Sequence, residues 1–471
     1  MNAFRKLLSL DLRALALMRI GIGCVLIFDL AVRFSDYVAF YSDYGVLPRE
    51  ASIVLLNQKD LLSLFFISGE PSVLIFLFAI SFWSHFHVLI GKNTRVYTII
   101  SWILLLSIQN RNTFIGQAGD DLLRLALLWG IFLPLNKYFS WDTKVNGKSS
   151  STLYFSWAGV GLTILVFSLY FFSACAKTSR EWTTDFTAVY YALSLDQITL
   201  SFGKWLYQFP ELLKVLTAVV YGLEWGGPFL LFIPWKKNVF RLLFVLLFVS
   251  FHLGLAATLF IGFFPAIVIV ILLAFLPSSV FDRWRFLKRY TSPNKESTAI
   301  EPVLWKKTLA STFIILVISY QFLWNCKNKG WIAADRIPYQ NIAYHLRLDQ
   351  SWGMFAPGVF KDDGWFIFEG VMSDSTVVDI SRNGEPVRYG KPADVASLFK
   401  NDRWRKYSEN LLHDRNKILR KYYAVYLYEK WLHTHPDTPL AGIRLVYMKE
   451  FTFSNYLYSE PKRRVLLEWR P

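Results

Sequence analysis

Charged side chains are scarce in this sequence. Only 18% of the 471 residues are Asp, Glu, Lys or Arg, whereas 54% are hydrophobic. Soluble proteins carry about 25% charged residues, so the composition excludes an ordinary soluble protein of this length. We expect an integral membrane protein whose main partner is the lipid bilayer.

Cysteine is also scarce. Cys24, Cys175 and Cys326 lie far apart in the sequence, and the first two fall inside apolar runs. The sequence contains neither a CxxC redox pair nor a cluster with the spacing of metal ligands. We therefore expect no disulfide and no metal site.

Acidic residues are outnumbered by basic ones, 35 against 51, which gives a formal net charge of +16. A charge of this sign can indicate nucleic-acid binding. Here, however, the basic residues lie mainly in short loops between apolar runs and in the C-terminal third of the chain. Membrane topology and anionic lipid explain this distribution, so we expect no nucleic-acid partner.

Long apolar runs, by contrast, are abundant, and runs of about 20 residues predict nine transmembrane helices. Their approximate bounds are 14–34, 71–91, 95–114, 119–135, 153–176, 211–234, 239–261, 263–281 and 305–325. The loops rich in Lys and Arg fall on the same side as the N-terminus, which the positive-inside rule assigns to the cytoplasm. An odd number of spans places the C-terminus outside the cytoplasm.

The sequence becomes more polar after Asn325, and residues 326–471 have the length of one soluble domain. Alternation of apolar and polar residues predicts strands, and helical spacing predicts two helices between them. The predicted strands are 365–372, 376–381, 442–453 and 465–469, and the predicted helices are 394–412 and 414–433. The expected fold is an all-α polytopic membrane bundle at 1–325, followed by a small α+β extracytoplasmic domain.

A single lysine, Lys177, ends the fifth apolar run. An ammonium group costs roughly 2.5–3.5 kcal/mol at the middle of a membrane helix and less near its end. One explanation is an interfacial lysine that extends its ammonium to the lipid headgroups. The other is a desolvated lysine that acts as a proton acceptor, because burial disfavours the charged form.

Other ionisable residues share the outer half of the predicted bundle with Lys177. Glu224 lies near the middle of the sixth span and His252 near the middle of the seventh. Because charged groups in lipid usually face the bundle interior and pair with one another, we expect an outward-opening polar pocket around these three residues. We expect one of the aspartates at the same depth, Asp29 of the first span or Asp120 or Asp121 of the fourth, to join them. The candidate residues at the start of the fourth span are Asp120, Asp121 and Arg124.

Each of these groups also has a structural alternative. His252 can be a core histidine whose hydrogen bonds are satisfied. His85 and His87 face different sides of one helix, so structural roles explain them better than metal binding. Acidic residues can form buried ion pairs that only fix packing. The pairs predicted on this basis are Asp120 or Asp121 with Arg124, and Asp29 with Arg111.

Several motifs, in order along the chain, resemble the horizontally transferred transmembrane (HTTM) family. This family includes the membrane domain of vitamin K-dependent γ-glutamyl carboxylases and their bacterial relatives. The similarity covers most of residues 10–370. Its carriers are 41–49 (YSDYGVLPR), 110–112 (NRN), 119–125 (GDDLLRL), 177–182 (KTSREW), His252 after Ser250 and Phe251, and 352–357 (WGMFAP). A bacterial member of this family would lie in the inner membrane, with its C-terminal domain outside the cytoplasm.

The resemblance implies a mechanism. In the carboxylases, the lysine matching Lys177 is regarded as the base that activates vitamin K hydroquinone, and a histidine matching His252 lies near the active region. A neutral lysine would deprotonate the hydroquinone, O2 would add, and the resulting strong base would remove a γ-proton from a substrate glutamate before CO2 is captured. The implied cofactors are reduced vitamin K or menaquinone, O2 and CO2. The implied partner is a protein or peptide substrate on the extracytoplasmic side.

The sequence also departs from the carboxylases. Where they have a histidine linked to substrate handling, near the start of the fourth span, this chain has Gly119, Asp120 and Asp121. Its C-terminal region is also much shorter than that of the animal enzymes, without an evident propeptide-binding part. Both departures argue against glutamate carboxylation and leave quinone chemistry or another oxidation open.

Two functions from different classes follow from these observations. The first is an enzyme of the quinol epoxidase or carboxylase type, with Lys177 as base and His252 as a second catalytic residue. The second is a non-catalytic membrane scaffold for the maturation, export or immunity of a partner protein. A pocket around Lys177 that is wide enough for a naphthoquinone and open to lipid would favour the enzyme, and a fully packed bundle would favour the scaffold. We also expect Trp352 and Phe355 to be buried against the bundle, so that the outer domain covers the pocket. The alternative is that both residues belong to the core of the soluble domain itself.

Overall fold

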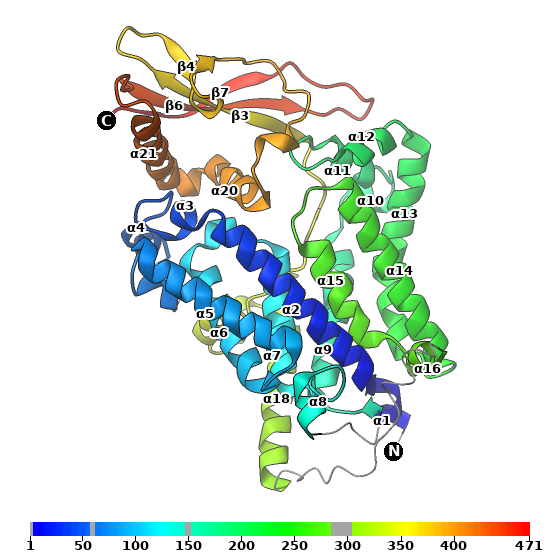
Figure 1. Ribbon diagram of the computed structural model, residues 1–471. Helices are drawn as coiled ribbons and strands as arrows, with labels where there is room; N and C mark the ends of the chain where they lie inside the picture. The colour runs from blue at the N-terminus through cyan, green and yellow to red at the C-terminus, as the bar shows by residue number, and fades with distance from the viewer. Residues whose placement is uncertain (1–2, 57–61, 147–151, 284–303) are drawn as a thin grey trace.

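The computed structural model describes residues 3–56, 62–146, 152–283 and 304–471. Most of this chain is helical. The N-terminus lies at one end of a helical bundle, and a five-stranded sheet formed by C-terminal residues lies at the opposite end (Figure 1). The architecture is therefore a bundle with a small sheet-containing part stacked on one end.

Six helices in the described part of the chain are long and apolar enough to cross a membrane. They are α2 (Leu12–Phe34), α5 (Pro71–Ile90), α9 (Trp157–Ala176), α13 (Pro210–Gly226, continued by η3, Gly227–Phe232), α14 (Lys237–Thr258) and α18 (Leu304–Asn328). The other three predicted spans are helical as well, but they are shorter or less apolar. They are α6 (Thr94–Arg111), α7 (Ala118–Phe132) and α15 (Phe264–Leu272, continued by η4, Leu273–Phe275).

Local sequence explains where these helices begin and end. Asp11 and Ser156 cap α2 and α9 by accepting hydrogen bonds from the first-turn N–H groups of Arg13 and Gly159. Proline occupies the first turn of α5, α13 and α15, where its missing N–H has no helical partner to lose. Gly91 ends α5 at a φ of 70°, and a Cβ there would collide with Ser140 and Arg19.

Helix α9 is the central helix of the bundle. It packs against α7, α13 and α18, and 78% of its apolar stretch is buried, the largest share among the six long helices. Helix α15 packs against α2, α7 and α14. A residue at the end of α9 is therefore surrounded by protein rather than by lipid.

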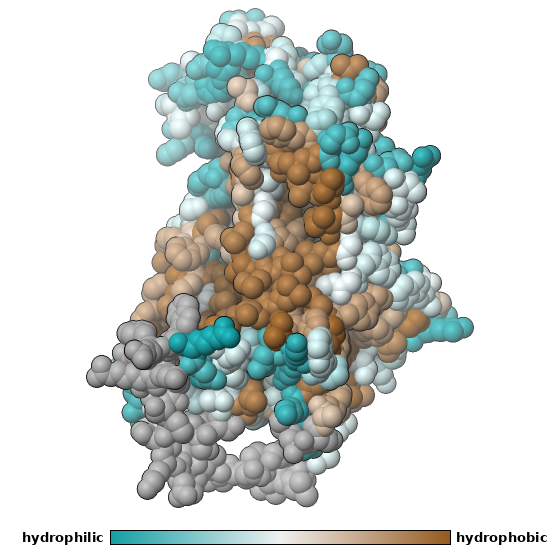
Figure 2. All heavy atoms as spheres, turned by 90° about the vertical axis from the view of Figure 1, so that its right-hand side faces the viewer, coloured by the Kyte–Doolittle hydropathy of each residue, from teal (hydrophilic) through white to brown (hydrophobic). Residues whose placement is uncertain are grey.

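The opposite property holds for α13 and α14, whose apolar side chains lie largely on the surface. Figure 2 shows this side of the molecule as a broad apolar face, hollowed along its length, below the more polar sheet-containing end. The exposed apolar residues include Val215, Val219, Leu243, Leu246 and Leu253. An exposed apolar face of this extent fits contact with the lipid bilayer.

The C-terminal part matches the predicted α+β arrangement. The antiparallel sheet has the strand order β5-β4-β3-β6-β7. Its strands are β3 (Asp362–Val371), β4 (Val377–Asp379), β5 (Glu385–Pro386), β6 (Gly442–Phe451) and β7 (Lys462–Trp469). Helices α20 (Asp402–Leu412) and α21 (Lys417–Thr434) lie between this sheet and the bundle (Figure 1). The hydrophobic core is continuous from the bundle through these helices to the sheet.

A buried cluster of four charges joins α20 to the bundle. Arg33 of α2 binds Asp29 at 2.7 Å and Asp120 of α7 at 2.6 Å. Arg403 of α20 binds the same two carboxylates, with 2.6 Å to Asp29 and 2.8 Å to Asp120. Two guanidinium groups and two carboxylates balance, so the cluster is neutral only when Arg403 is in place. The hydroxyl of Tyr41 accepts a further hydrogen bond from Arg33.

The cluster predicts a large effect of Arg403→Met. This change leaves two buried carboxylates with one guanidinium, and breaking a buried pair on one side costs about 3–5 kcal/mol. We expect a loss of that size in the free energy of unfolding, measured with denaturant in detergent micelles. The double variant Arg403→Met with Asp29→Asn restores neutrality and should recover part of the loss. Arg415→Met, at an exposed site of the same part of the chain, serves as the control; a single Arg403 variant as stable as this control would contradict the account.

Candidate functional site

Helix α9 presents three polar side chains on one face. Tyr170, Ser173 and Lys177 are spaced by three and four residues, which places them in one stripe along a helix. Lys177 directly follows the last residue of α9, and its N–H donates to Ala174 O at 3.0 Å. The stripe faces α13 and α14, from which Glu224 and His252 reach it.

Lys177 is held by three partners inside the protein. Its Nζ donates to Glu224 Oε2 at 2.6 Å and to Ser173 Oγ at 2.7 Å. The same Nζ lies 4.9 Å from the centre of the Trp182 ring. Lys177 is 3% exposed and Glu224 is 5% exposed. These contacts are those of a buried ammonium group, so the alternative of a lysine that extends to the lipid headgroups is wrong.

His252 forms the second polar group of the site. Its Nε2 lies 2.9 Å from the Tyr170 hydroxyl, whose ring packs against Phe248 at a centroid distance of 3.9 Å. The His252 residue is 1% exposed. The other ring nitrogen, Nδ1, has no hydrogen-bond partner among the described residues. The ring is therefore fixed at one edge and unpaired at the other.

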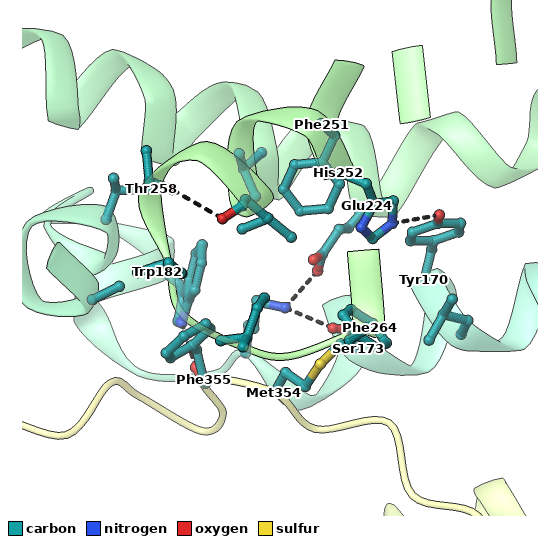
Figure 3. Close-up of a pocket in the computed structure, with 18 of the residues that line it drawn as sticks. Tyr170, Ser173, Trp182, Glu224, Phe251, His252, Thr258, Phe264, Met354 and Phe355 are labelled. Carbon is teal, nitrogen blue, oxygen red and sulfur yellow. Dashed lines mark hydrogen bonds and ion pairs between the residues drawn. The ribbon is translucent and has the colours of Figure 1, made fainter. Parts of the chain in front are cut away.

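These groups line one cavity (Figure 3). Its volume, taken as the space open to the centre of a water molecule, is about 100 Å³, and part of the cavity is continuous with the surroundings. Apart from the polar groups described above, its walls are almost entirely aliphatic and aromatic. They include Leu169, Val189, Leu193, Val220, Phe251, Leu255, Phe264, Met354 and Phe355. The predicted grouping of Lys177, Glu224 and His252 in one pocket is thus confirmed.

The prediction that an aspartate joins this pocket is wrong. Asp120 points instead into the charge cluster with Arg33 and Arg403. Asp121 pairs with Arg124 at 2.7 Å, as the structural alternative predicted, and neither residue lines the cavity. The physical reason is that Arg33 and Arg403, neither of which lines the cavity, already neutralise Asp120.

A second hollow, lined mainly by polar residues, contains the two aspartates of α7. Its other lining residues include Arg33, Gln109, Asn112, Gln117, Arg347 and Lys406. The predicted pair of Asp29 with Arg111 is also wrong. Arg111 Nη2 donates to the backbone oxygens of Leu47 at 2.9 Å and Ser42 at 3.4 Å.

The remaining histidines of the predicted spans have structural partners. His85 Nδ1 lies 2.9 Å from Ser101 Oγ, and His87 Nδ1 lies 2.9 Å from Trp83 O. Within the described ranges, no group of three or more His, Cys, Asp or Glu side chains is placed to hold a metal ion.

The cavity has a roof made from two segments that are distant in sequence. Trp182, in α10 (Arg180–Thr183), donates from Nε1 to Phe355 O at 2.9 Å, and Ser179 N donates to Pro357 O at 3.1 Å. Lys361 binds Glu181 at 2.6 Å. Burial alone would raise the pKa of Glu181, but the hydrogen bond and the charge of Lys361 lower it to about 2. The carboxylate of Glu181 thus stays charged and keeps the two segments together near neutral pH.

The roof contains residues that the sequence analysis singled out and others that it missed. Trp352 is 1% exposed within the core that the bundle shares with the outer part, and Phe355 is half-buried and lines the cavity. The predicted contact of Phe355 with the bundle is thus confirmed. Tyr170, Ser173 and Trp182 were not predicted as site residues. Their spacing from Lys177 along α9 was the available signal for the first two.

The segment that follows α11 (Ala188–Ser194) is joined to the sheet by Gln197. Gln197 Nε2 donates to Gly364 O at 2.9 Å and to Tyr447 Oη at 3.0 Å, while its N–H donates to Asp363 Oδ2 at 3.2 Å. Lys391 bridges Asp196, at 2.6 Å, and Glu450. Burial, helped by Asp196 and Glu450, raises the pKa of Asp363 to about 7 against hydrogen bonds from two backbone N–H groups.

Comparisons with known proteins leave the site to be interpreted from its own geometry. No protein-family model, no curated protein and no solved structure matches the chain.

The raised pKa of Asp363 predicts a pH-dependent stability. The folded state binds a proton more tightly than the unfolded state, whose aspartate has a pKa near 3.8. Stability should therefore be greatest at low pH and fall as pH rises from about 4 to about 7, by up to ~1.4 kcal/mol per pH unit. Asp363→Asn should remove this slope in unfolding experiments at fixed ionic strength. Asp362→Asn, at the exposed neighbouring position, should keep it; equal slopes in the two variants would refute the assignment.

Proposed function

We propose that the protein is a membrane enzyme that deprotonates a reduced quinone in the cavity around Lys177. The observation that carries this proposal is the buried Lys177–Glu224 pair in the wall of an apolar cavity. A packing role alone needs no such space, and a bundle that serves only as a scaffold would be filled at this position. The cavity therefore argues against the scaffold alternative.

The Lys177–Glu224 pair can take up one proton. At rest the ammonium and the carboxylate are neutral together, joined by a hydrogen bond of 2.6 Å. Transfer of the Nζ proton to Glu224 leaves a neutral amine, which then accepts the proton of a ligand hydroxyl. The pair becomes singly positive beside a singly negative ligand, so the cavity gains no net charge. This balance matters because an unpaired charge is costly in a low-dielectric site.

The shape and chemistry of the cavity suit a flat aromatic ligand. Phe251, Phe264 and Phe355 supply aromatic walls, and the polar groups are confined to Lys177–Glu224–Ser173 and Tyr170–His252. Apolar walls with a few placed polar groups are typical of small-molecule sites. When bound, a reduced quinone would supply the hydroxyl that is deprotonated and the electrons for oxygen reduction.

The resemblance to HTTM proteins supports reduced vitamin K or menaquinone as this cofactor, with O2 as oxidant. Carboxylation with CO2 of a glutamate in a protein or peptide substrate is the extension that the carboxylase branch suggests. In this chain the matching stretch near the start of α7 is Gly119, Asp120 and Asp121, without a histidine, and Arg33 and Arg403 already neutralise Asp120. This arrangement supports quinol oxidation more directly than carboxylation.

We further propose that the protein lies in the inner membrane of a bacterium with its sheet on the extracytoplasmic side. The N-terminus lies at the end of the bundle opposite the sheet (Figure 1). Basic residues of predicted cytoplasmic loops, such as Lys237 and Arg241, contact the N-terminal segment there. The positive-inside rule favours the cytoplasm for that end.

The catalytic role of Lys177 predicts loss of oxygen uptake in two variants. Purified protein supplied with reduced menaquinone should consume O2, and Lys177→Ala should lower the rate at least about 100-fold, because a general base contributes at least that factor. Lys177→Arg should fail as well, since a guanidinium with a pKa above about 12 cannot act as a base. Lys214→Arg, at an exposed site on α13, should keep the wild-type rate. Full activity in Lys177→Arg would give Lys177 a purely electrostatic role.

The proposed orientation is tested with reporters that act on only one side of the membrane. A reporter fused after Pro471 should be active only outside the cytoplasm. A reporter inserted within 283–300, of which the structure describes only Arg283, should be active only inside. The reverse pattern at either site would reject the nine-span topology.

A further inference from the structure

The unpaired nitrogen of His252 is the starting point. Among the described residues that line the cavity, His252 Nδ1 is the one buried side-chain polar atom without a hydrogen-bond partner. Lys177 and Glu224 satisfy each other, and the Tyr170 hydroxyl is bound to His252 Nε2. A buried polar atom left unpaired costs about 1–3 kcal/mol. Such an atom in the wall of a cavity indicates that a ligand supplies the missing partner.

The two polar groups of the cavity are separated along α9. Tyr170 and Lys177 are seven residues apart, a rise of about 10 Å along the helix. The dashed contacts of the two groups also lie apart in Figure 3. A ring with one oxygen at each end can offer an oxygen to each of two polar groups that lie apart.

We propose that His252 Nδ1 binds the second oxygen of the ligand, at the far end of the ring from Lys177, and that Tyr170 is the positioning residue for His252. This inference rests on the proposed function and adds a second contact point to it. It assigns Tyr170 a role although Tyr170 itself does not contact the reacting oxygen.

Tyr170 is suited to this role because a hydroxyl can both donate and accept a hydrogen bond. When Nε2 carries the proton, it donates to the Tyr170 oxygen, and Nδ1 can accept from the hydroxyl of a quinol. When Nδ1 carries the proton, Tyr170 donates to Nε2, and Nδ1 can donate to the carbonyl of a quinone. A histidine held by a carbonyl or a carboxylate would be fixed in one tautomer. The hydroxyl of Tyr170 therefore lets one site hold both the reduced and the oxidised ligand.

Binding of three matched probes tests the second contact point. The probes are 2,3-dimethyl-1,4-naphthoquinone, its quinol under anaerobic conditions, and 2,3-dimethyl-1-naphthol, which lacks one oxygen. Their dissociation constants are measured by equilibrium dialysis of the full-length protein in detergent micelles, against empty micelles. One net hydrogen bond corresponds to about 3- to 10-fold in affinity. Wild-type protein should bind the two-oxygen probes tighter than the naphthol by this factor.

Tyr170→Phe and His252→Leu should reduce that advantage to less than about twofold. Tyr221→Phe is the matched control, because Tyr221 is half-buried on α13 and does not line the cavity; it should keep the full advantage. If every variant keeps the advantage, or the wild type shows none while binding all three probes, the role of Tyr170 and His252 is overturned and the quinone site stands. If the wild type binds no probe, the quinone site itself is rejected, and this inference falls with it.

Nitrogen NMR of the histidine rings gives a readout that packing alone would not change. The chain has 7 histidines, and the spectrum of ¹⁵N-histidine-labelled His252→Leu identifies the missing signals. The ring nitrogens of His252 should report opposite tautomers in the quinone and quinol complexes of the wild type. The same tautomer in both complexes would refute the proposed exchange.

Discussion

Neutralisation of buried charge by a residue from a remote part of the chain is the constraint on which this structure depends. Asp29 and Asp120 lie inside the bundle, where Arg33 is the one basic residue paired with them among the bundle residues that the structure describes. Arg403 completes the balance from α20, some 280 residues after Asp120 in the sequence. The sheet-containing part is therefore an electrostatic component of the bundle, which its shared hydrophobic core also shows.

The same principle organises the cavity. Lys177 can remain buried because Glu224, Ser173 and the Trp182 ring surround its ammonium group, each from a different segment. Once satisfied, the pair is a proton-exchanging unit in an apolar environment, where its interaction with a polar ligand is stronger than in water. The roof segments add Trp182, Met354 and Phe355 to the apolar walls of that environment. Structural stability and candidate chemistry thus depend on the same contacts.

Local patterns in the sequence predicted the elements well. Apolar runs located α2, α5, α9, α13, α14 and α18, and alternation located β3 and β6 within a few residues. The predicted depth of each residue also grouped Lys177, Glu224 and His252, because ionisable groups that are costly to place in lipid pair with others at the same depth. The predicted depth does not distinguish between partners at the same level of the membrane. The prediction therefore paired Asp29 with Arg111, whereas its partners are Arg33 and Arg403. Tyr170 and Ser173 carry no charge, so their insertion into lipid did not mark them as site residues in the sequence. The structure identifies them through their position on the same face of α9 as Lys177.

The position of Arg403 has a consequence for the order in which the molecule is made. Ribosomal synthesis completes all of the long apolar helices before Arg403 is added, and Met354 and Phe355 are also added after those helices. A newly inserted bundle therefore holds one surplus negative charge and a cavity without part of its roof until translation of the last hundred residues. The chain can reach its neutral form, with the roof in place, only after the C-terminal part has been synthesised and has folded against the bundle. The last step of folding thus completes the candidate site. A chain interrupted after α18 is an incomplete bundle, not a complete bundle that lacks an accessory domain.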